Sequence, residues 1–327
     1  MFQKFILKSK HALIQSSEKF TNSKPAQALS PDQFARKGLK MNFASEDGRE
    51  EALNANIYVH AFLSNSGDYQ KSPHFRPENQ AKVRRILTRI VAIKAASKQG
   101  ITKAIDFGCG TGFMIDLMKD MFNEVHGIDI TKEMMKHVDL SCGNVFLHES
   151  LAEKTPFPDN HFDFATAYSF MDHLFNYVDF LKEAHRVLKP GGTFYSDLNP
   201  NRAFINSMAR IESDKTSIIM PIVQKEVAGA LHNGEHYEKQ FGMNASMLEK
   251  AEPIKSKDKG FDSEAVLSAA RKIGFSDCKV EFEWFLGQAT IMHGQSPESA
   301  DVVDKYLNSV LPVSSQLFKY LRFIFIK

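Results

Sequence analysis

The chain has 327 residues, with 41 basic and 39 acidic side chains, and 43% of its residues are hydrophobic. The near-neutral charge provides no overall attraction for nucleic acid, and no apolar run reaches the roughly 20 residues of a membrane helix. The three cysteines, without a CxxC pair, argue against a disulfide framework and a zinc site. We therefore expect a cytoplasmic protein with no transmembrane segment and no metal ligands.

The first 75 residues are predicted to form an N-terminal extension and a helical cover, ahead of one domain over residues 76–327. Residues 1 to about 50 are polar and typical of a linker or a loosely held segment. Residues 50–67 carry apolar side chains at helical spacing. Residues 76–100 predict a clear helix, with a proline near its start and a glycine at its end.

Strand and helix patterns then alternate. Short apolar stretches predict strands at residues 103–108, 124–130, 144–150, 162–168, 193–199, 278–285 and 321–327. Helical patterns occupy residues 112–122, 131–141, 178–192, 262–275 and a stretch around 298–320. Residues 201–260 interrupt the alternation. This order predicts an α/β fold, with a mostly parallel seven-stranded sheet covered by helices on both faces.

The stretch AIDFGCGTGF, residues 104–113, places three glycines at alternate positions between a strand and a helix. Glycine tolerates positive φ and lacks the Cβ that would hold a ligand away from the backbone. The helix that follows offers unpaired N–H groups in its first turn. Because ligands of open α/β sheets bind at the carboxyl ends of the strands, this turn predicts a cofactor site.

The spacing of the glycines distinguishes between two candidate cofactors, a dinucleotide and S-adenosylmethionine. A dinucleotide turn has the pattern G-x-G-x-x-G, but Phe113 stands where its last glycine belongs. The pattern here is G-x-G-x-G, and Asp106 lies two positions before the first glycine. A carboxylate there is unfavourable beside a pyrophosphate and favourable beside an ammonium or sulfonium group, both of which S-adenosylmethionine carries. A nicotinamide dehydrogenase is therefore disfavoured.

Asp129 is predicted to lie at the tip of the second strand, at the end of VHGID. A carboxylate at this place can accept hydrogen bonds from two ribose hydroxyls, a role that serves nucleotides in general. Asp129 therefore supports a nucleotide, while the glycine spacing and Asp106 select S-adenosylmethionine.

Four motifs follow one another in order: AIDFGCGTGF, VHGIDIT, LAEKTPFPDNHFDFATAYSFMDHL and EAHRVLKPGGTFYSDLN. With these motifs the sequence resembles the class I S-adenosylmethionine-dependent methyltransferases, especially the small-molecule group that includes enzymes of the ubiquinone/menaquinone-biosynthesis type. The resemblance covers roughly residues 80–200 and, more weakly, residues 260–327. It implies a Rossmann-like fold that ends in an antiparallel strand, with S-adenosyl-L-methionine as cofactor.

The resemblance also implies which residues bind that cofactor. The set is Arg76, Asp106, Gly108, Cys109, Gly110, Gly112, Asp129, Ile130, Leu151, Ala152 and Ala167. Asp106 through Gly112 hold the methionine part, Asp129 the ribose, and Ile130 the adenine. Many relatives have an aspartate where Leu151 stands, so its contact to the exocyclic amine is missing here. Arg76 is either a partner of the methionine carboxylate or a surface charge.

The sulfonium already activates the methyl group, so the protein has mainly to position the acceptor. His173, in MDHL, is the candidate general base, with a hydrogen-bonded structural histidine as the alternative. Tyr168 either orients the acceptor or packs on the cofactor. Residues 201–260 are predicted to form a helical lid above the cofactor. Its apolar side chains would be Phe204, Met208, Met220, Phe241, Met243 and Met247.

Together these features predict methyl transfer from S-adenosylmethionine to oxygen, nitrogen or carbon of a small organic molecule. An RNA or protein methyltransferase is one alternative, but there is no DPPY-type motif and no dense basic stripe with interleaved aromatic residues. A non-catalytic regulatory protein that binds the cofactor is the other. No nucleic-acid partner is expected, and a homodimer is one possible assembly.

Overall fold

The computed structural model describes residues 48–66, 75–95, 103–214, 221–232, 234–235, 238–239 and 242–327. The segment expected to be a linker, up to residue 47, lies outside these described residues. So do Met220 and Phe241 of the expected lid.

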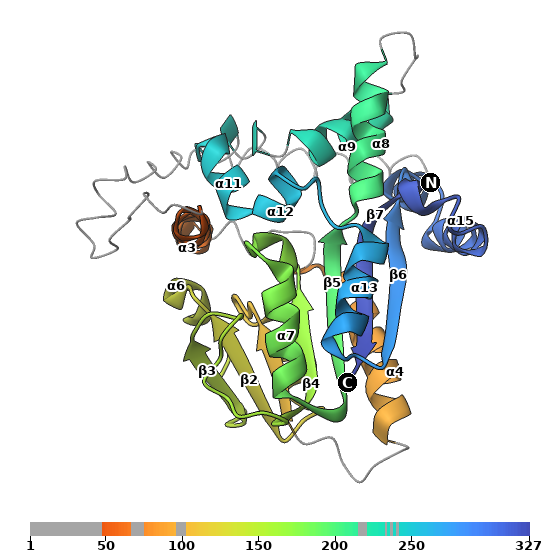
Figure 1. Ribbon diagram of the computed structural model, residues 1–327. Coiled ribbons are helices and arrows are strands. Elements are labelled where there is room, and N and C mark those ends of the chain that lie inside the picture. Colours follow the sequence, from red (N-terminus) through yellow and green to blue (C-terminus); the bar gives the residue numbers. More distant parts are fainter. Residues whose placement is uncertain are drawn as a thin grey trace, which may run out of the picture.

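One seven-stranded sheet organises the described chain (Figure 1). Its strands are β1 (Lys103–Phe107), β2 (Glu124–Asp129), β3 (Val145–Glu149), β4 (Phe162–Tyr168), β5 (Leu188–Pro200), β6 (Asp277–Phe285) and β7 (Phe318–Ile326). The order across the sheet is β3-β2-β1-β4-β5-β7-β6. The first five strands run parallel, and β7 pairs antiparallel with both of its neighbours. The predicted fold class, with its antiparallel last strand, is confirmed.

Helices cover both faces of this sheet. They are α3 (Arg49–Ser66), α4 (Pro77–Ala95), α5 (Phe113–Met118), α6 (Lys132–Met135), α7 (Tyr177–Val187), α8 (Arg202–Ser213), α9 (Pro221–Leu231), α11 (Ala245–Ala251), α12 (Pro253–Ser256), α13 (Ser263–Ile273), α14 (Gln288–Gly294) and α15 (Pro297–Ser309). Two 3₁₀ turns are η4 (Met171–His173) and η5 (Ser315–Leu317). Side chains of α7 and α13 join one core cluster, and those of α4 and α5 join another.

Alternation along each strand divides the core between these clusters. Ile105 packs with α7 and α13, whereas its neighbour Ala104 packs with α4 and α5. Phe194 and Tyr195 of β5 divide in the same way. Successive strand side chains point to opposite faces, so a sheet buried on both faces needs apolar residues at nearly every position. This requirement explains the short, continuous apolar stretches in the sequence.

Several predicted helices end earlier than expected, among them α5 at Met118 and α15 at Ser309. Helix α7 ends at Val187, and the segment Pro190-Gly191-Gly192 lies inside β5 instead of closing the helix. A proline disfavours the helical conformation of the residue before it, so the chain is already extended at Lys189. Helix α6 spans only Lys132–Met135; Thr131 occupies its N-cap position, but the Thr131 side chain makes no cap hydrogen bond.

The insertion at residues 201–260 divides into two parts. Phe204 and Met208 of α8 pack against Val227 of α9. Helix α11 instead packs on α3, in a cluster that includes Met243 and Leu248. Figure 1 shows α3, α11 and α12 beyond the end of the sheet where α7 begins. Two segments far apart in sequence therefore form one layer over this end of the sheet.

A buried ion-pair network joins the last three strands of the sheet. Arg322 of β7 is 2% exposed, and its Nε and Nη2 atoms each lie 2.9 Å from Oδ2 of Asp197 on β5. Its Nη1 donates to Glu281 and also pairs with Glu283, both on β6, at 2.8 and 2.6 Å. The Tyr195 hydroxyl donates to the same Asp197 oxygen at 2.6 Å. The network thus fixes the antiparallel edge to the parallel part.

Replacing Arg322 by methionine should lower the free energy of unfolding by about 3–5 kcal/mol, because it leaves Asp197 buried without its counter-charge. Urea denaturation of the two proteins measures the difference. Lys132→Met serves as the control, since Lys132 pairs with Glu149 at the exposed surface and its loss should leave the transition nearly unchanged. Equal effects of the two substitutions would contradict this role for Arg322.

Candidate functional site

The glycine turn after β1 adopts the backbone conformation that its sequence requires. Gly108, Gly110 and Gly112 have φ values of +67°, +51° and +93°. A Cβ on Gly108 would lie 2.0 Å from the ring of Phe170, and one on Gly112 would lie 3.2 Å from Val138. Both the left-handed conformation and the crowding therefore demand glycine.

Asp129, at the end of β2, ties the turn to the neighbouring strand. Its Oδ2 accepts from the Gly110 N–H at 2.9 Å, and its Oδ1 accepts from the Thr131 N–H at 2.7 Å. Burial raises the pKa of Asp129, and these two hydrogen bonds act in the opposite direction. Each carboxylate oxygen keeps a second lone pair, so Asp129 retains the capacity to accept from a ligand.

Asp106 lies behind the turn. It is 2% exposed, and its Oδ1 accepts from the Thr166 hydroxyl at 2.7 Å. Burial raises the pKa of Asp106 to about 7, against the opposing effect of the Thr166 hydrogen bond. The proton on Asp106 is therefore held more tightly in the folded chain than in the unfolded one.

A cavity of about 560 Å³ opens at the carboxyl ends of the central strands. The structure brings these predicted site residues together in its wall: Gly108, Gly110, Asp129, Ile130, Leu151, Ala152, Tyr168 and His173. Cys109, Gly112 and Ala167 are buried and, like Asp106, are not among the residues that line it. Arg76 is exposed at the start of α4, also outside the cavity wall.

Sequence reasoning missed the side chains that α3 contributes to this cavity. Ala52, Leu53, Asn56 and His60 of α3 all line it. Their positions follow from the packing of α3 on α11, which depends on contacts between distant segments. The sequence predicted a helical cover within residues 1–75, but the helical spacing of residues 50–67 did not indicate which of its side chains would line the cavity.

Of the residues that the structure describes within the insertion at 201–260, none is among those that line the cavity. Helices α11 and α12 reach the cavity wall indirectly. Helix α11 packs on α3, and the carbonyl of Ala251 contacts His173. The insertion therefore supports the cavity from behind in the described part of the chain.

His173 has one ring nitrogen committed to the backbone. Its Nδ1 lies 3.0 Å from the carbonyl oxygen of Ala251. A carbonyl only accepts, so Nδ1 carries the proton and Nε2 keeps its lone pair. The His60 ring packs edge-on at 4.8 Å, and burial followed by the charge of His173 lowers the pKa of His60 to about 4. His60 is thus neutral beside His173 at physiological pH.

Tyr168 contacts α4 and also α5, the helix that follows the glycine turn. Its hydroxyl accepts from Asn79 at 3.0 Å, and its ring centroid lies 4.7 Å from that of Phe113. Burial raises the pKa of Tyr168, so the phenol is neutral. Tyr168 therefore contributes a neutral aromatic ring, and no phenolate oxygen, to the cavity wall.

Comparison with known proteins identifies the class to which this site belongs. Residues 105–196, from β1 into β5, match a sequence family described as a methyltransferase domain. The prediction of a class I S-adenosylmethionine-dependent methyltransferase domain is confirmed, with S-adenosylmethionine as the cofactor of this class. Among the described residues, no helix is both long and apolar enough to span a membrane.

Individual relatives match less than a third of this chain. A probable S-adenosylmethionine-dependent methyltransferase of Mycolicibacterium smegmatis is 35% identical over 99 residues, which is 30% of this chain and 38% of the relative. A demethylmenaquinone methyltransferase of Staphylococcus aureus is 42% identical over 97 residues, 28% of this chain and 40% of the relative. The match thus spans about two fifths of the length of these curated relatives.

Among solved structures, phosphoethanolamine N-methyltransferase 2 of Haemonchus contortus is similar, with a TM-score of 0.48 and 15% sequence identity. The alignment covers 86% of this chain and 60% of that one. A similarity of this degree carries no information about the acceptor.

Gly108→Ala tests the demand for glycine in the turn. Gly143→Ala is its matched control, because Gly143 has a φ of +75° but open space around it. The control should lose about 1–2 kcal/mol from the left-handed conformation alone. Gly108→Ala should lose about 1–3 kcal/mol more through its clash with Phe170. Denaturation curves measure both; equal losses would mean that the Phe170 ring moves aside freely.

Asp106→Asn should change how stability depends on pH. Because the folded-state pKa of Asp106 is raised to about 7, its contribution to stability is complete below pH 4 and is lost as the pH rises through 7. The advantage of the wild-type chain over Asp106→Asn should therefore shrink between pH 4.5 and 8 and then level off. Urea unfolding of both proteins across this range measures it, and a constant difference would show that Asp106 titrates normally.

Proposed function

We propose that this chain transfers the methyl group of S-adenosylmethionine to oxygen, nitrogen or carbon of a small organic molecule. The observation that carries the proposal is the cavity, which the glycine turn and Asp129 bound on one side and α3 on the other. Its volume of about 560 Å³ lies within the range of small-molecule sites. A nucleoside with an amino-acid arm takes much of this space, and the remainder suits a small acceptor.

The cofactor is proposed to lie along the ends of β1, β2 and β4. Gly108 and Gly110, which have no side chain to hold a ligand away, face its methionine part, and Asp129 accepts from the ribose hydroxyls through its remaining lone pairs. Ile130 and Ala152 border the adenine. Leu151 offers no side-chain acceptor for the exocyclic amine, so recognition of the adenine falls to backbone groups and apolar contact. Asp106 acts from behind the turn through its charge, not through direct contact.

The reaction is an in-line displacement at the methyl carbon. A lone pair of the acceptor forms the new bond to carbon, the S–CH₃ bond breaks, and its electrons remain on sulfur, which gives S-adenosylhomocysteine. Any proton that the acceptor loses goes to a base. His173 is proposed as that base, because its Nε2 has an available lone pair and its ring lines the cavity. Tyr168 is proposed to position the acceptor or cofactor through its ring.

Asp129→Ala should weaken the binding of S-adenosylmethionine and S-adenosylhomocysteine more than tenfold, or about 1.4 kcal/mol, through loss of the ribose contact. Calorimetry on the full chain measures this, and NAD should not bind. Asp139→Ala is the control, since Asp139 is exposed and pairs with Lys119 away from the cavity. Unchanged affinity in Asp129→Ala would remove this residue from the ribose role.

Transfer of labelled methyl groups decides the acceptor class. The chain is supplied with labelled S-adenosylmethionine and separate pools of small hydroxylated, amine and enolic compounds, RNA, and protein. Label in a small-molecule pool supports the proposal, provided that Asp129→Ala lowers it. Label in RNA or protein alone, or cofactor binding without transfer to any pool, would overturn it.

A further inference from the structure

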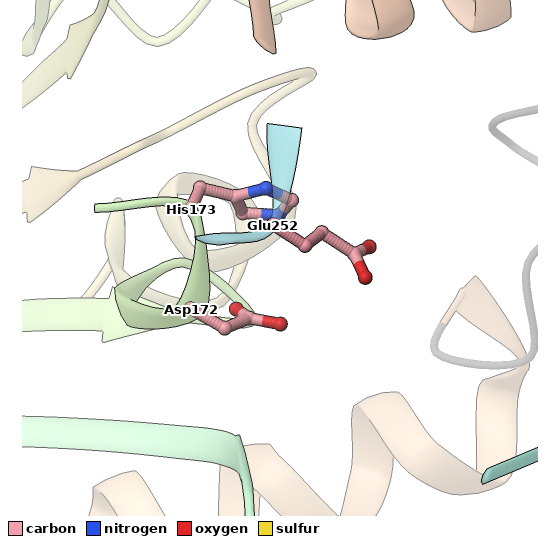
Figure 2. A group of neighbouring side chains, drawn as sticks. All are labelled: Asp172, His173 and Glu252. Atoms are coloured by element: carbon pink, nitrogen blue, oxygen red, sulfur yellow. The ribbon is translucent and has the colours of Figure 1, made fainter. Parts of the chain in front are cut away.

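Three ionisable side chains meet where η4 lies against the insertion (Figure 2). One oxygen of Asp172, one oxygen of Glu252 and one ring nitrogen of His173 all lie within 4.8 Å of one another. Asp172 and His173 belong to η4, directly after β4, whereas Glu252 lies between α11 and α12. In Figure 2 the two carboxylates point to the same side of the cluster. The packing of the insertion on η4 creates this cluster.

Asp172 has an oxygen that nothing in the described chain satisfies. The residue is 6% exposed, and its Oδ1 has no hydrogen-bond partner among the described residues. An unpartnered, buried carboxylate oxygen costs free energy, and such groups are uncommon in native proteins. One oxygen of Asp172 lies within 4.8 Å of the ligand atoms of His173 and Glu252, so a ligand placed between the three side chains would give this carboxyl group a partner.

The two carboxyl groups of the cluster differ in their partners. Lys255 lies 2.7 Å from Oε2 of Glu252 and forms an ion pair with it. No hydrogen bond or ion pair joins Lys255 to Asp172 in the described chain. A cation bound between the three side chains would give Asp172 a partner of opposite charge.

His173 already has the geometry of a metal-ligating histidine. Metal-bound imidazoles usually donate their second N–H to a carbonyl or carboxylate, which fixes the ring and raises its basicity. The Nδ1–H of His173 donates to Ala251 in this way at 3.0 Å. Its Nε2 is therefore the nitrogen available as a ligand. The residue that follows Ala251 is Glu252, so one stretch of backbone orients the histidine and supplies a carboxylate.

We propose that Asp172, His173 and Glu252 bind one divalent transition-metal ion. Two carboxylate oxygens and one imidazole nitrogen suit Mn²⁺ or a similar borderline cation. Ligands about 2.0–2.2 Å from one ion lie within about 4.4 Å of each other, so small side-chain rotations bring the three atoms into range.

The ion would change the role of His173. Of the three ligands, His173 is the one among the described residues that lines the cavity, so an ion on its Nε2 would lie beside the cavity and would be able to take an oxygen of the acceptor, a consequence that rests on the proposed function. His173 is then a ligand instead of a base. A coordinated oxygen would lose its proton more readily, and that proton would pass to solvent water instead of to His173.

The full chain, treated with a chelator and dialysed, is titrated with Mn²⁺ without any cofactor. Electron paramagnetic resonance of the free ion counts the bound Mn²⁺, and we expect one tight site per chain. Asp172→Asn and Glu252→Gln should each weaken it at least tenfold. Glu51→Gln is the matched control, because Glu51 forms a similar carboxylate–lysine pair with Lys250 outside the cluster. It should leave Mn²⁺ affinity unchanged within twofold.

Lys255→Gln supplies a second, opposite test. Removing the ammonium frees Glu252 and removes a repulsive charge, so Mn²⁺ affinity should rise severalfold. Absence of a site in the wild-type chain, or a site that survives both Asp172→Asn and Glu252→Gln, overturns the proposal. S-adenosylhomocysteine binding, measured on the same variants, shows that they are folded. It also distinguishes failure of this proposal from failure of the proposed function: because cofactor binding needs no metal, a chain that binds S-adenosylhomocysteine but not Mn²⁺ contradicts only the metal site.

Discussion

The carboxylate of Asp129 holds the two halves of the site in register. One of its oxygens accepts from Gly110 in the turn after β1, and the other accepts from Thr131 at the start of α6. Because β1 and β2 are parallel neighbours, their carboxyl ends meet at one edge, and this single side chain bridges them. The glycines of this turn have positive φ values, and Asp106 is buried behind the turn. Together with the backbone hydrogen bond from Cys109 to Ile128, this bridge fixes the turn against β2.

The floor of the cavity is the glycine turn after β1 together with Asp129. The roof, which is formed by α3, α11 and α12, has a different origin. Helix α3 precedes the sheet in sequence, α11 follows β5, and the two pack on each other through a small apolar cluster of their own. The carbonyl of Ala251 then orients His173, and Glu252 joins the same group of side chains. The floor is thus formed by local strand–turn–helix units, whereas the roof depends on contacts between segments that are distant in the chain.

This difference explains how much the sequence could predict. Every strand was predicted within a few residues, because a sheet buried on both faces leaves an apolar stretch at each strand. The glycine turn and Asp129 could also be predicted, because local backbone geometry dictates those residue types. The place of α3, the contact of Ala251 with His173, and the meeting of Asp172 with Glu252 were not legible. They follow from tertiary packing, which leaves no periodic pattern in a single sequence.

The separation of floor and roof has an evolutionary consequence. The stretch that matches the methyltransferase family, residues 105–196, contains the floor, while α3, α11 and α12 lie outside it. Substitutions in the roof can therefore alter which molecules are admitted without disturbing the machinery that holds the methyl donor. Selection can act on the two parts almost independently. Chains that share the inner region can in this way differ in the helices around the cavity while the glycine turn and Asp129 stay the same.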